Sequence, residues 1–155
     1  MRFVVMGVSG CGKSLIGAAF AAGRGLPFVD GDSLHPPENI AKMRRGAPLN
    51  DTDRAPWLDR VGQVLQQPGV VACSALKRAY RDRIRAMAGQ PVVFLYLRGQ
   101  RATLLDRMAT RPGHFMPVSL LDSQLATLEE PAADEAHLIA DIEQAPEAIV
   151  AIFAR

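Results

Sequence analysis

Short apolar runs recur along the chain, and the stretches between them carry apolar residues at a helical period. Apolar runs without polar alternation are typical of strands that are covered on both faces of a sheet. The predicted strands are Phe3–Met6, Leu26–Val29, Val70–Cys73, Val92–Leu97 and His137–Ile142. The predicted helices are Lys13–Ala22, Pro37–Arg45, Ala55–Gln67, Lys77–Met87, Arg101–Thr110, Val118–Leu128 and Pro146–Phe153.

Strands that alternate with helices predict a parallel sheet with right-handed crossover connections. We therefore expect an α/β fold, in which a doubly wound, five-stranded parallel sheet is flanked by helices. The length of 155 residues and the hydrophobic content of 48% suit a single domain that spans residues 1–155. Ligands of such folds bind beyond the carboxyl ends of the strands, so the residues that follow each strand carry the candidate chemistry.

The residues after the first predicted strand form a phosphate loop. Residues 7–14 read Gly-Val-Ser-Gly-Cys-Gly-Lys-Ser and match the pattern G-x-x-x-x-G-K-S/T between a strand and a helix. Glycines let consecutive backbone N–H groups turn toward a polyphosphate, Lys13 can reach its β- and γ-phosphates, and the Ser14 hydroxyl can ligate Mg²⁺. The residues expected to bind ATP are Gly7, Val8, Ser9, Gly10, Cys11, Gly12, Lys13, Ser14 and Leu15, joined by Arg107.

An acidic pair follows the second predicted strand. Many phosphate-loop enzymes hold Mg²⁺ through a carboxylate at the end of a second strand, and the third and fourth predicted strands end without one. We therefore expect Asp30 to support Mg²⁺ together with Ser14, and Asp32 to orient the hydroxyl of an acceptor and take its proton. The alternative is that Asp-Gly-Asp is only a turn, since these residue types favour turns.

Residues 34–58 form an insert that is rich in hydrogen-bonding side chains, which suits a polyhydroxylated, anionic acceptor. Its candidate acceptor ligands are His35, Lys42 and Arg54. Asp53 is a candidate N-cap for the helix that follows, with Pro56 near its first turn. Trp57 is interpreted as a core residue rather than a stacking platform, and Arg44 as solvated.

Basic residues follow the third predicted strand. Lys77 stands at the start of the next helix, where it can meet a ligand, and Arg81 comes one turn later. Both are therefore candidate acceptor ligands.

Residues 107–120 are interpreted as a lid that bears arginine. Arg107 and Arg111 share one helix face, a Pro-Gly pair then ends the helix, and His114 can touch the acceptor. A lid of this kind excludes water and stabilises charge on the transferring phosphoryl group. The alternative is that both arginines are ordinary surface residues.

Bulk composition narrows the possible partners. The formal net charge of +2 is too small to argue for nucleic acid or an anionic membrane, and no apolar run approaches the length of a membrane span. The two cysteines are too few for a disulfide framework, and the first residues lack the pattern of a signal peptide. We therefore expect a cytoplasmic protein.

Taken together, these motifs resemble the bacterial-type gluconate kinases, small-molecule kinases akin to shikimate kinase and adenylate kinase. The matching stretches are residues 7–14, 29–36, 49–58, 73–82, 113–117, 121–124 and 128–131. The blocks Asp-Gly-Asp-Ser-Leu-His-Pro and Cys-Ser-Ala-Leu-Lys are far more specific than the phosphate loop. The resemblance implies transfer of the γ-phosphoryl group of ATP to the 6-hydroxyl of D-gluconate, which gives 6-phosphogluconate, in an enzyme that is usually a homodimer.

The expected catalytic residues are Lys13, Asp32, Arg107 and Arg111. Two other functions stay open at this point. One is a kinase for another small acceptor, such as shikimate or a nucleoside monophosphate, against which the blocks around His35 and Lys77 stand. The other is a nucleotide-binding switch without acceptor chemistry, against which the acidic pair and the arginine lid stand.

Overall fold

The structure is a computed structural model, and it describes residues 1–110 and 118–155. Its strands are β1 (Arg2–Met6), β2 (Phe28–Asp30), β3 (Gly69–Ala72), β4 (Val93–Arg98) and β5 (His137–Asp141). Its helices are α1 (Lys13–Arg24), the 3₁₀ turn η1 (Gly31–Leu34), α2 (Pro37–Arg44), α3 (Asp51–Val64), α4 (Arg78–Ala88), α5 (Arg101–Thr110), α6 (Val118–Thr127) and α7 (Pro146–Phe153).

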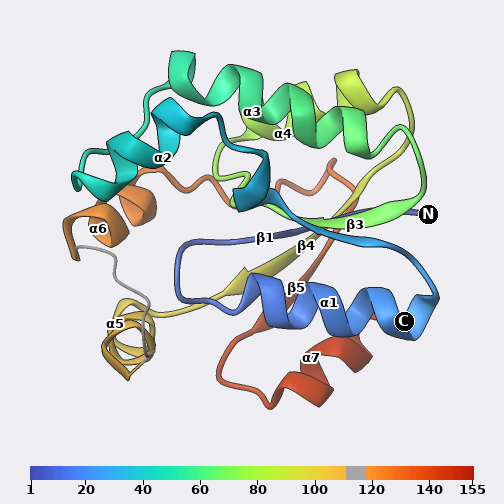
Figure 1. Cartoon of the computed structure of the whole chain (residues 1–155). Helices are drawn as coiled ribbons and strands as arrows, with labels where there is room; N and C mark the ends of the chain where they lie inside the picture. The colour runs from blue at the N-terminus through green and yellow to red at the C-terminus, as the bar shows by residue number, and fades with distance from the viewer. Residues whose placement is uncertain (111–117) are drawn as a thin grey trace.

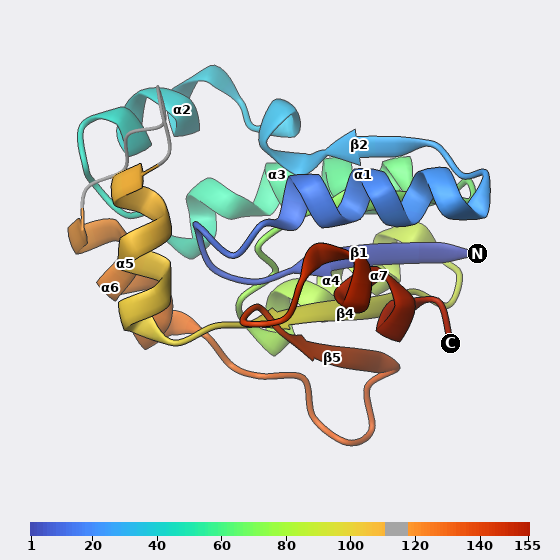
Figure 2. The same ribbon diagram turned by 90° about the horizontal axis from the view of Figure 1, so that it is seen from below.

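The five strands form one parallel sheet in the order β2-β3-β1-β4-β5. Helices α3 and α4 cover one face of the sheet, and α1 and α7 cover the other (Figures 1 and 2). Helices α2, α5 and α6 lie beyond the carboxyl ends of the strands. The fold class predicted from the sequence is confirmed. Within the described residues, every helix is too short or too polar to cross a bilayer.

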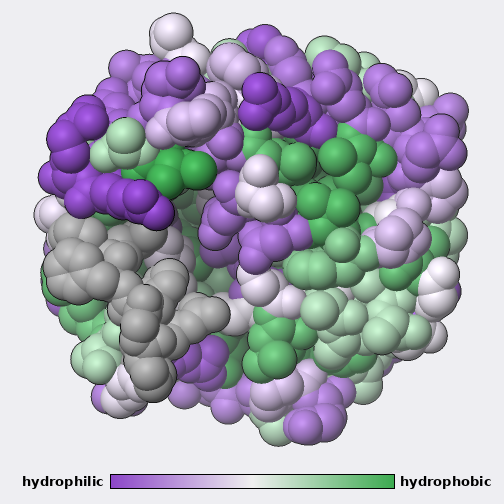
Figure 3. Space-filling model, in the orientation of Figure 1, coloured by the Kyte–Doolittle hydropathy of each residue, from purple (hydrophilic) through white to green (hydrophobic). Residues whose placement is uncertain are grey.

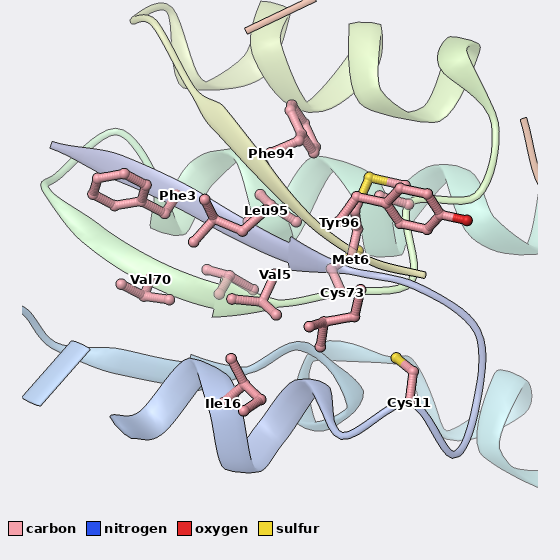
Figure 4. Close-up of a cluster of buried hydrophobic side chains, with 14 of the residues drawn as sticks. Phe3, Val5, Met6, Cys11, Ile16, Val70, Cys73, Phe94, Leu95 and Tyr96 are labelled. Carbon is pink, nitrogen blue, oxygen red and sulfur yellow. The ribbon is translucent and has the colours of Figure 1, made fainter. Parts of the chain in front are cut away.

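The core lies on both faces of the central strands. Val5 of β1 and Leu95 of β4 are fully buried, and Ile16 of α1 packs against the same cluster (Figure 4). Cys11 of the phosphate loop and Cys73 after β3 join this core as small apolar side chains, and both are free thiols. The buried side chain of Cys11 therefore anchors the phosphate loop to the hydrophobic core.

Helix α3 begins earlier than the sequence pattern predicts. It starts at Asp51 rather than near Ala55, and its N-cap is Asn50 rather than Asp53. The Asn50 side chain accepts from the backbone N–H of Asp53, and the Asp53 carboxylate accepts from the backbone N–H of Asn50. This reciprocal capping box stabilises the first turn, so the helix forms ahead of Pro56 and continues through it.

Helices α3 and α4 pack closely because α3 has a glycine at their contact. A Cβ at Gly62 would lie 2.5 Å from the Met87 Cβ and 3.0 Å from the Ile84 carbonyl oxygen. The approach of the two helices thus depends on the missing side chain.

We expect Gly62→Ala to lower the free energy of unfolding by about 1–3 kcal/mol, the usual cost of overpacking a core. Urea denaturation measures this change. Gly23→Ala in α1 is the matched control, because a Cβ there meets no atom within 4 Å; it should raise stability by roughly 0.5–1 kcal/mol through helix propensity. Equal effects of the two variants would contradict this account of the contact.

Candidate active site

A cavity of about 580 Å³ opens at the carboxyl edge of the sheet, between the phosphate loop and helices α2, α3 and α6. The phosphate loop and β2 edge contribute Ser9, Gly10, Gly12, Lys13, Ser14, Asp30, Asp32 and His35. The insert contributes Ile40, Met43, Arg44, Pro48, Leu49, Arg54 and Trp57. The rest of the lining is Ser74, Leu76, Leu120, Ser123 and Gln124.

The phosphate loop turns as its glycines predict. Gly12 has a φ of 92° and forms the N-cap of α1, so the loop enters the helix through a left-handed residue. The Lys13 ammonium donates to the Val8 carbonyl across the loop at 3.1 Å, which keeps the cation at the cavity wall. The amino end of α1, with its partial positive charge, points toward the same space.

Ser14 and Asp30 meet beside the loop. The Ser14 hydroxyl donates to Oδ2 of Asp30 at 2.8 Å, and the backbone N–H of Asp32 donates to Oδ1 at 3.0 Å. A hydroxyl and a carboxylate side by side are oxygen ligands of the kind that Mg²⁺ takes, usually with phosphates and water completing its shell. The residues present therefore fit the expected ion.

Asp32 faces the same cavity from η1, and the backbone before it is held on two sides. The Trp57 indole N–H donates to the Gly31 carbonyl at 2.8 Å. A Cβ at Gly31 would lie 2.2 Å from the Ala72 carbonyl oxygen, so only glycine allows η1 to rest on β3. Trp57 is buried, as predicted from the sequence, and it also positions the acidic segment.

His35 lies at the cavity wall, stacked on Trp57 with ring centroids 4.0 Å apart. The Asn39 amide donates to the Asp53 carbonyl at 2.8 Å, which fixes the orientation of the amide, and the same nitrogen lies 3.2 Å from the His35 Nδ1. Nδ1 is therefore the acceptor, and the proton sits on Nε2. Burial, and then the charge of Arg54, lower the pKa of His35 to about 4, so the ring is neutral near pH 7.

Arg54 lines the cavity from α3 and is oriented by Tyr80. Its Nη1 donates to the Tyr80 hydroxyl at 2.8 Å, and that hydroxyl donates to the Asp51 carboxylate. Burial and the hydrogen bond to Asp51 raise the pKa of Tyr80 to about 12, so the phenol is neutral. The closest Asp51 oxygen is 3.7 Å from Arg54. The guanidinium thus keeps donors for an anionic ligand.

Three predicted acceptor ligands do not line the cavity. Lys42 forms an ion pair with Asp53 at 2.7 Å, and Lys77 lies 3.9 Å from Asp51. Arg81 is fully buried and pairs with Glu135, so the expectation that it meets the acceptor is wrong. Lys42 and Lys77 keep partly exposed side chains, so their roles toward the acceptor stay predictions.

The predicted lid is described only in part. The Arg107 guanidinium donates to the Ile142 carbonyl after β5, so it lies beside the loop that leads into α7 rather than at the cavity wall. Arg111 and His114 lie outside the described residues.

Several lining residues go beyond those expected from the sequence. Ser74 and Leu76 follow β3 directly, and the rule that ligands bind at strand ends could have indicated them. Gln124 of α6 accepts from the Ser9 backbone N–H at 2.7 Å, a contact that no local pattern predicts. Arg44, interpreted as solvated, is exposed and also borders the cavity.

A second, apolar cleft of about 390 Å³ lies between α1 and α7, next to the phosphate loop. Leu15, Ile16 and Ala19 line one side, and Pro146 and Val150 line the other with Glu147. Figure 3 shows apolar side chains gathered over this part of the molecule. Leu15 is 65% exposed there, so the helix directly after the phosphate loop presents an apolar side chain to solvent.

Comparison with known proteins agrees with this geometry. A family model described as shikimate kinase matches residues 9–153. The thermosensitive gluconokinase of Escherichia coli strain K12 is 48% identical, over 97% of this chain and 88% of that protein. A crystal structure of a gluconokinase from Sinorhizobium meliloti 1021 has 51% identity and a TM-score of 0.91, and covers 97% of this chain and 87% of that one.

A shikimate kinase from Aquifex aeolicus, at 14% identity, has a TM-score of 0.63 over 99% of this chain and 94% of that one, which shows a shared fold. The resemblance read from the sequence motifs is confirmed. The chain belongs to the shikimate kinase family and, within it, to the gluconokinases.

Proposed function

We propose that this chain transfers the γ-phosphoryl group of ATP to the 6-hydroxyl of D-gluconate, which yields 6-phosphogluconate and ADP. One observation carries the proposal: Lys13 of the phosphate loop, Asp32 and Arg54 line the same cavity. A phosphate donor and a polar, anionic acceptor can therefore meet there. The names of relatives, among them gluconokinases at 48%, 44% and 43% identity, support gluconate as that acceptor.

ATP occupies the phosphate loop, with its phosphates against Lys13 and the backbone N–H groups that precede α1. The apolar cleft beside Leu15 and Pro146 continues from the loop and suits the flat, apolar faces of adenine. Arg107 hydrogen-bonds to the loop that follows β5, which borders this cleft. In this position Arg107 would bind the nucleotide rather than the acceptor.

Ser14 and Asp30 hold Mg²⁺ in this proposal, because they offer two oxygen ligands 2.8 Å apart at the edge of the phosphate site. When bound, Mg²⁺ neutralises charge on the β- and γ-phosphates. Asp30 also accepts from the Asp32 backbone N–H, so the same carboxylate fixes the start of η1.

The acceptor lies on the insert side of the cavity. Arg54 pairs with the gluconate carboxylate, because its guanidinium is charged and the phenol of Tyr80 holds it in place. Neutral His35 donates from Nε2 to a hydroxyl or carboxylate oxygen. Asp32 accepts the proton of the 6-hydroxyl. The hydroxyl oxygen then bonds to the γ-phosphorus, while the bond between that phosphorus and the β–γ bridging oxygen breaks.

The proposed enzyme is cytoplasmic and a homodimer. Two buried, free cysteines suit a reducing compartment, which supports a cytoplasmic enzyme. Assembly as a homodimer stays a prediction from the family resemblance.

The first test is ADP release from Mg-ATP in parallel reactions with D-gluconate, shikimate, AMP or no acceptor. We expect release with gluconate only. Release with another acceptor would keep the phosphate-loop chemistry and overturn the substrate. Nucleotide binding without release in any reaction would favour the nucleotide-binding switch.

Lys13→Ala and Asp32→Asn should each lower kcat by at least about 100-fold, the scale for losing one electrostatic or acid–base group. Steady-state kinetics with gluconate measures both. Asp30→Asn is the matched control for Asp32→Asn: excess Mg²⁺ should partly restore the Asp30 variant and leave the Asp32 variant unchanged. Near-normal turnover of Asp32→Asn would remove Asp32 from proton transfer.

The lowered pKa of His35 predicts a specific dependence of stability on pH. The folded-state pKa is about 4 and the reference value 6.5, so on acidification the unfolded chain takes up a proton first. The free energy of unfolding therefore falls between about pH 6.5 and 4, by at most about 3 kcal/mol from this residue. His35→Gln lacks this loss, so the stability gap between wild type and variant should narrow with acid in urea denaturation. Parallel pH profiles would contradict a neutral, buried His35.

A further inference from the structure

The turn between β3 and α4 contains a strained residue. Ala75 has a φ of 46°, and it is the one non-glycine residue with a positive φ across residues 1–110 and 118–155. An L-residue with a Cβ avoids this left-handed region, so such a conformation persists only where neighbouring groups impose it. Ala75 is also fully buried, so water does not satisfy its backbone.

Arg81 holds the carbonyl of this residue. Its Nη1 donates to the Ala75 carbonyl at 2.8 Å, while its Nε and Nη2 donate to the two carboxylate oxygens of Glu135 at 2.8 and 3.1 Å. Both side chains are buried, at 0% and 1% exposure. A planar guanidinium held by two bonds on one side has little freedom on the other, so the position of the Ala75 carbonyl is fixed.

Glu135 is itself held firmly. It accepts from the backbone N–H of Ala132 at 2.8 Å and from Arg85, besides its two bonds with Arg81. The segment before β5 is thus connected, through the Glu135 carboxylate and the Arg81 guanidinium, to the turn at Ala75, which lies more than fifty residues earlier in the sequence.

The residues on either side of Ala75 form part of the cavity wall. Ser74 and Leu76 both line it. The Ser74 carbonyl accepts from the backbone N–H of Gly7 at 3.3 Å, and the Leu76 carbonyl accepts from the backbone N–H of Glu129 at 2.7 Å. A change in the backbone angles of Ala75 would rotate both neighbours relative to the phosphate loop.

We propose that Arg81 is a positioning residue for the acceptor: it holds Ala75 in the left-handed conformation that sets Ser74 and Leu76 against the substrate. Identifying the acceptor as gluconate rests on the function proposed above. The turn touches the phosphate loop through the bond from Gly7 to the Ser74 carbonyl, but the loop keeps further anchors in β1 and in the buried Cys11. Loss of the Arg81 contact is therefore expected to act on acceptor binding far more than on ATP binding.

The test uses four variants of the full chain. Arg81→Lys keeps a charge for Glu135 but lacks the fork that reaches Ala75 at the same time. Ala75→Gly removes the strain, because glycine adopts positive φ readily. The double variant combines the two changes. Arg83→Lys is the matched control on the same helix, where Arg83 is exposed and pairs with Asp59.

We expect Arg81→Lys to raise the KM for gluconate by about 10- to 100-fold and to leave the KM for ATP within about two-fold, the scale of a misplaced binding group. Arg83→Lys should match wild type, and Ala75→Gly, with Arg81 still bound to its carbonyl, should raise the KM for gluconate far less than Arg81→Lys does. The double variant should regain most of the lost affinity, because a glycine in place of Ala75 adopts the turn without help. An unchanged gluconate KM in Arg81→Lys, an equal rise for ATP, or no recovery in the double variant would each overturn the proposal.

A second readout does not depend on the substrate. Hydrogen exchange of the backbone amides of residues 74–77 should be faster in Arg81→Lys than in wild type and Arg83→Lys; unchanged exchange would overturn the proposal. If Arg81→Lys does not fold, Glu135→Gln, which loosens the hold on Arg81, should give the same changes at smaller size. A wild type that releases no ADP with gluconate refutes the proposed function instead, and hydrogen exchange then still decides the role of Arg81.

Discussion

The hydrogen bond from the Trp57 indole to the Gly31 carbonyl joins the two halves of the site. One half is the sheet edge with its acidic pair, and the other is the insert that would hold an acceptor. Because Trp57 is also the stacking partner of His35, a single buried ring contacts both the backbone before Asp32 and the imidazole at the cavity wall. These contacts tie the α3 end of the insert to the sheet edge, which favours a preorganised acceptor site there.

Arginines serve two different purposes in this molecule, and their partners distinguish them. Arg81 faces a buried carboxylate and is electrically satisfied, so it supports the backbone. Arg54 hydrogen-bonds to a neutral phenol and has the Asp51 carboxylate only at 3.7 Å, so its guanidinium keeps donors for an anion. Exposed arginines such as Arg98 and Arg101 form ion pairs with carboxylates and contribute little to stability. The hydrogen-bond or ion-pair partner of each arginine therefore determines whether it supports the fold or stays available to a ligand.

Those partners explain what can and cannot be predicted from the sequence. Strands, phosphate loop and sheet class follow from local patterns, and Asp30 and Asp32 follow from the rule for strand ends. The role of Arg81 cannot be predicted from local patterns, because its partner Glu135 is far away in the sequence. Helical periodicity shows on which face of a helix a residue lies, but it does not show which residue packs against that face. The start of α3 escapes prediction because Asp53, a plausible N-cap beside Pro56, instead closes a capping box with Asn50 one turn earlier.

The burial of both thiols has a practical meaning. Cys11 lies under the phosphate loop and Cys73 at the end of β3, each 1% exposed, and burial raises the pKa of the Cys73 thiol to about 12. A thiol reagent reaches neither sulfur until the loop or the strand separates from the core. Labelling of either thiol would therefore detect separation of the phosphate loop or of β3 from the core. For the same reason, the loop cysteine is protected from oxidants while the protein stays folded.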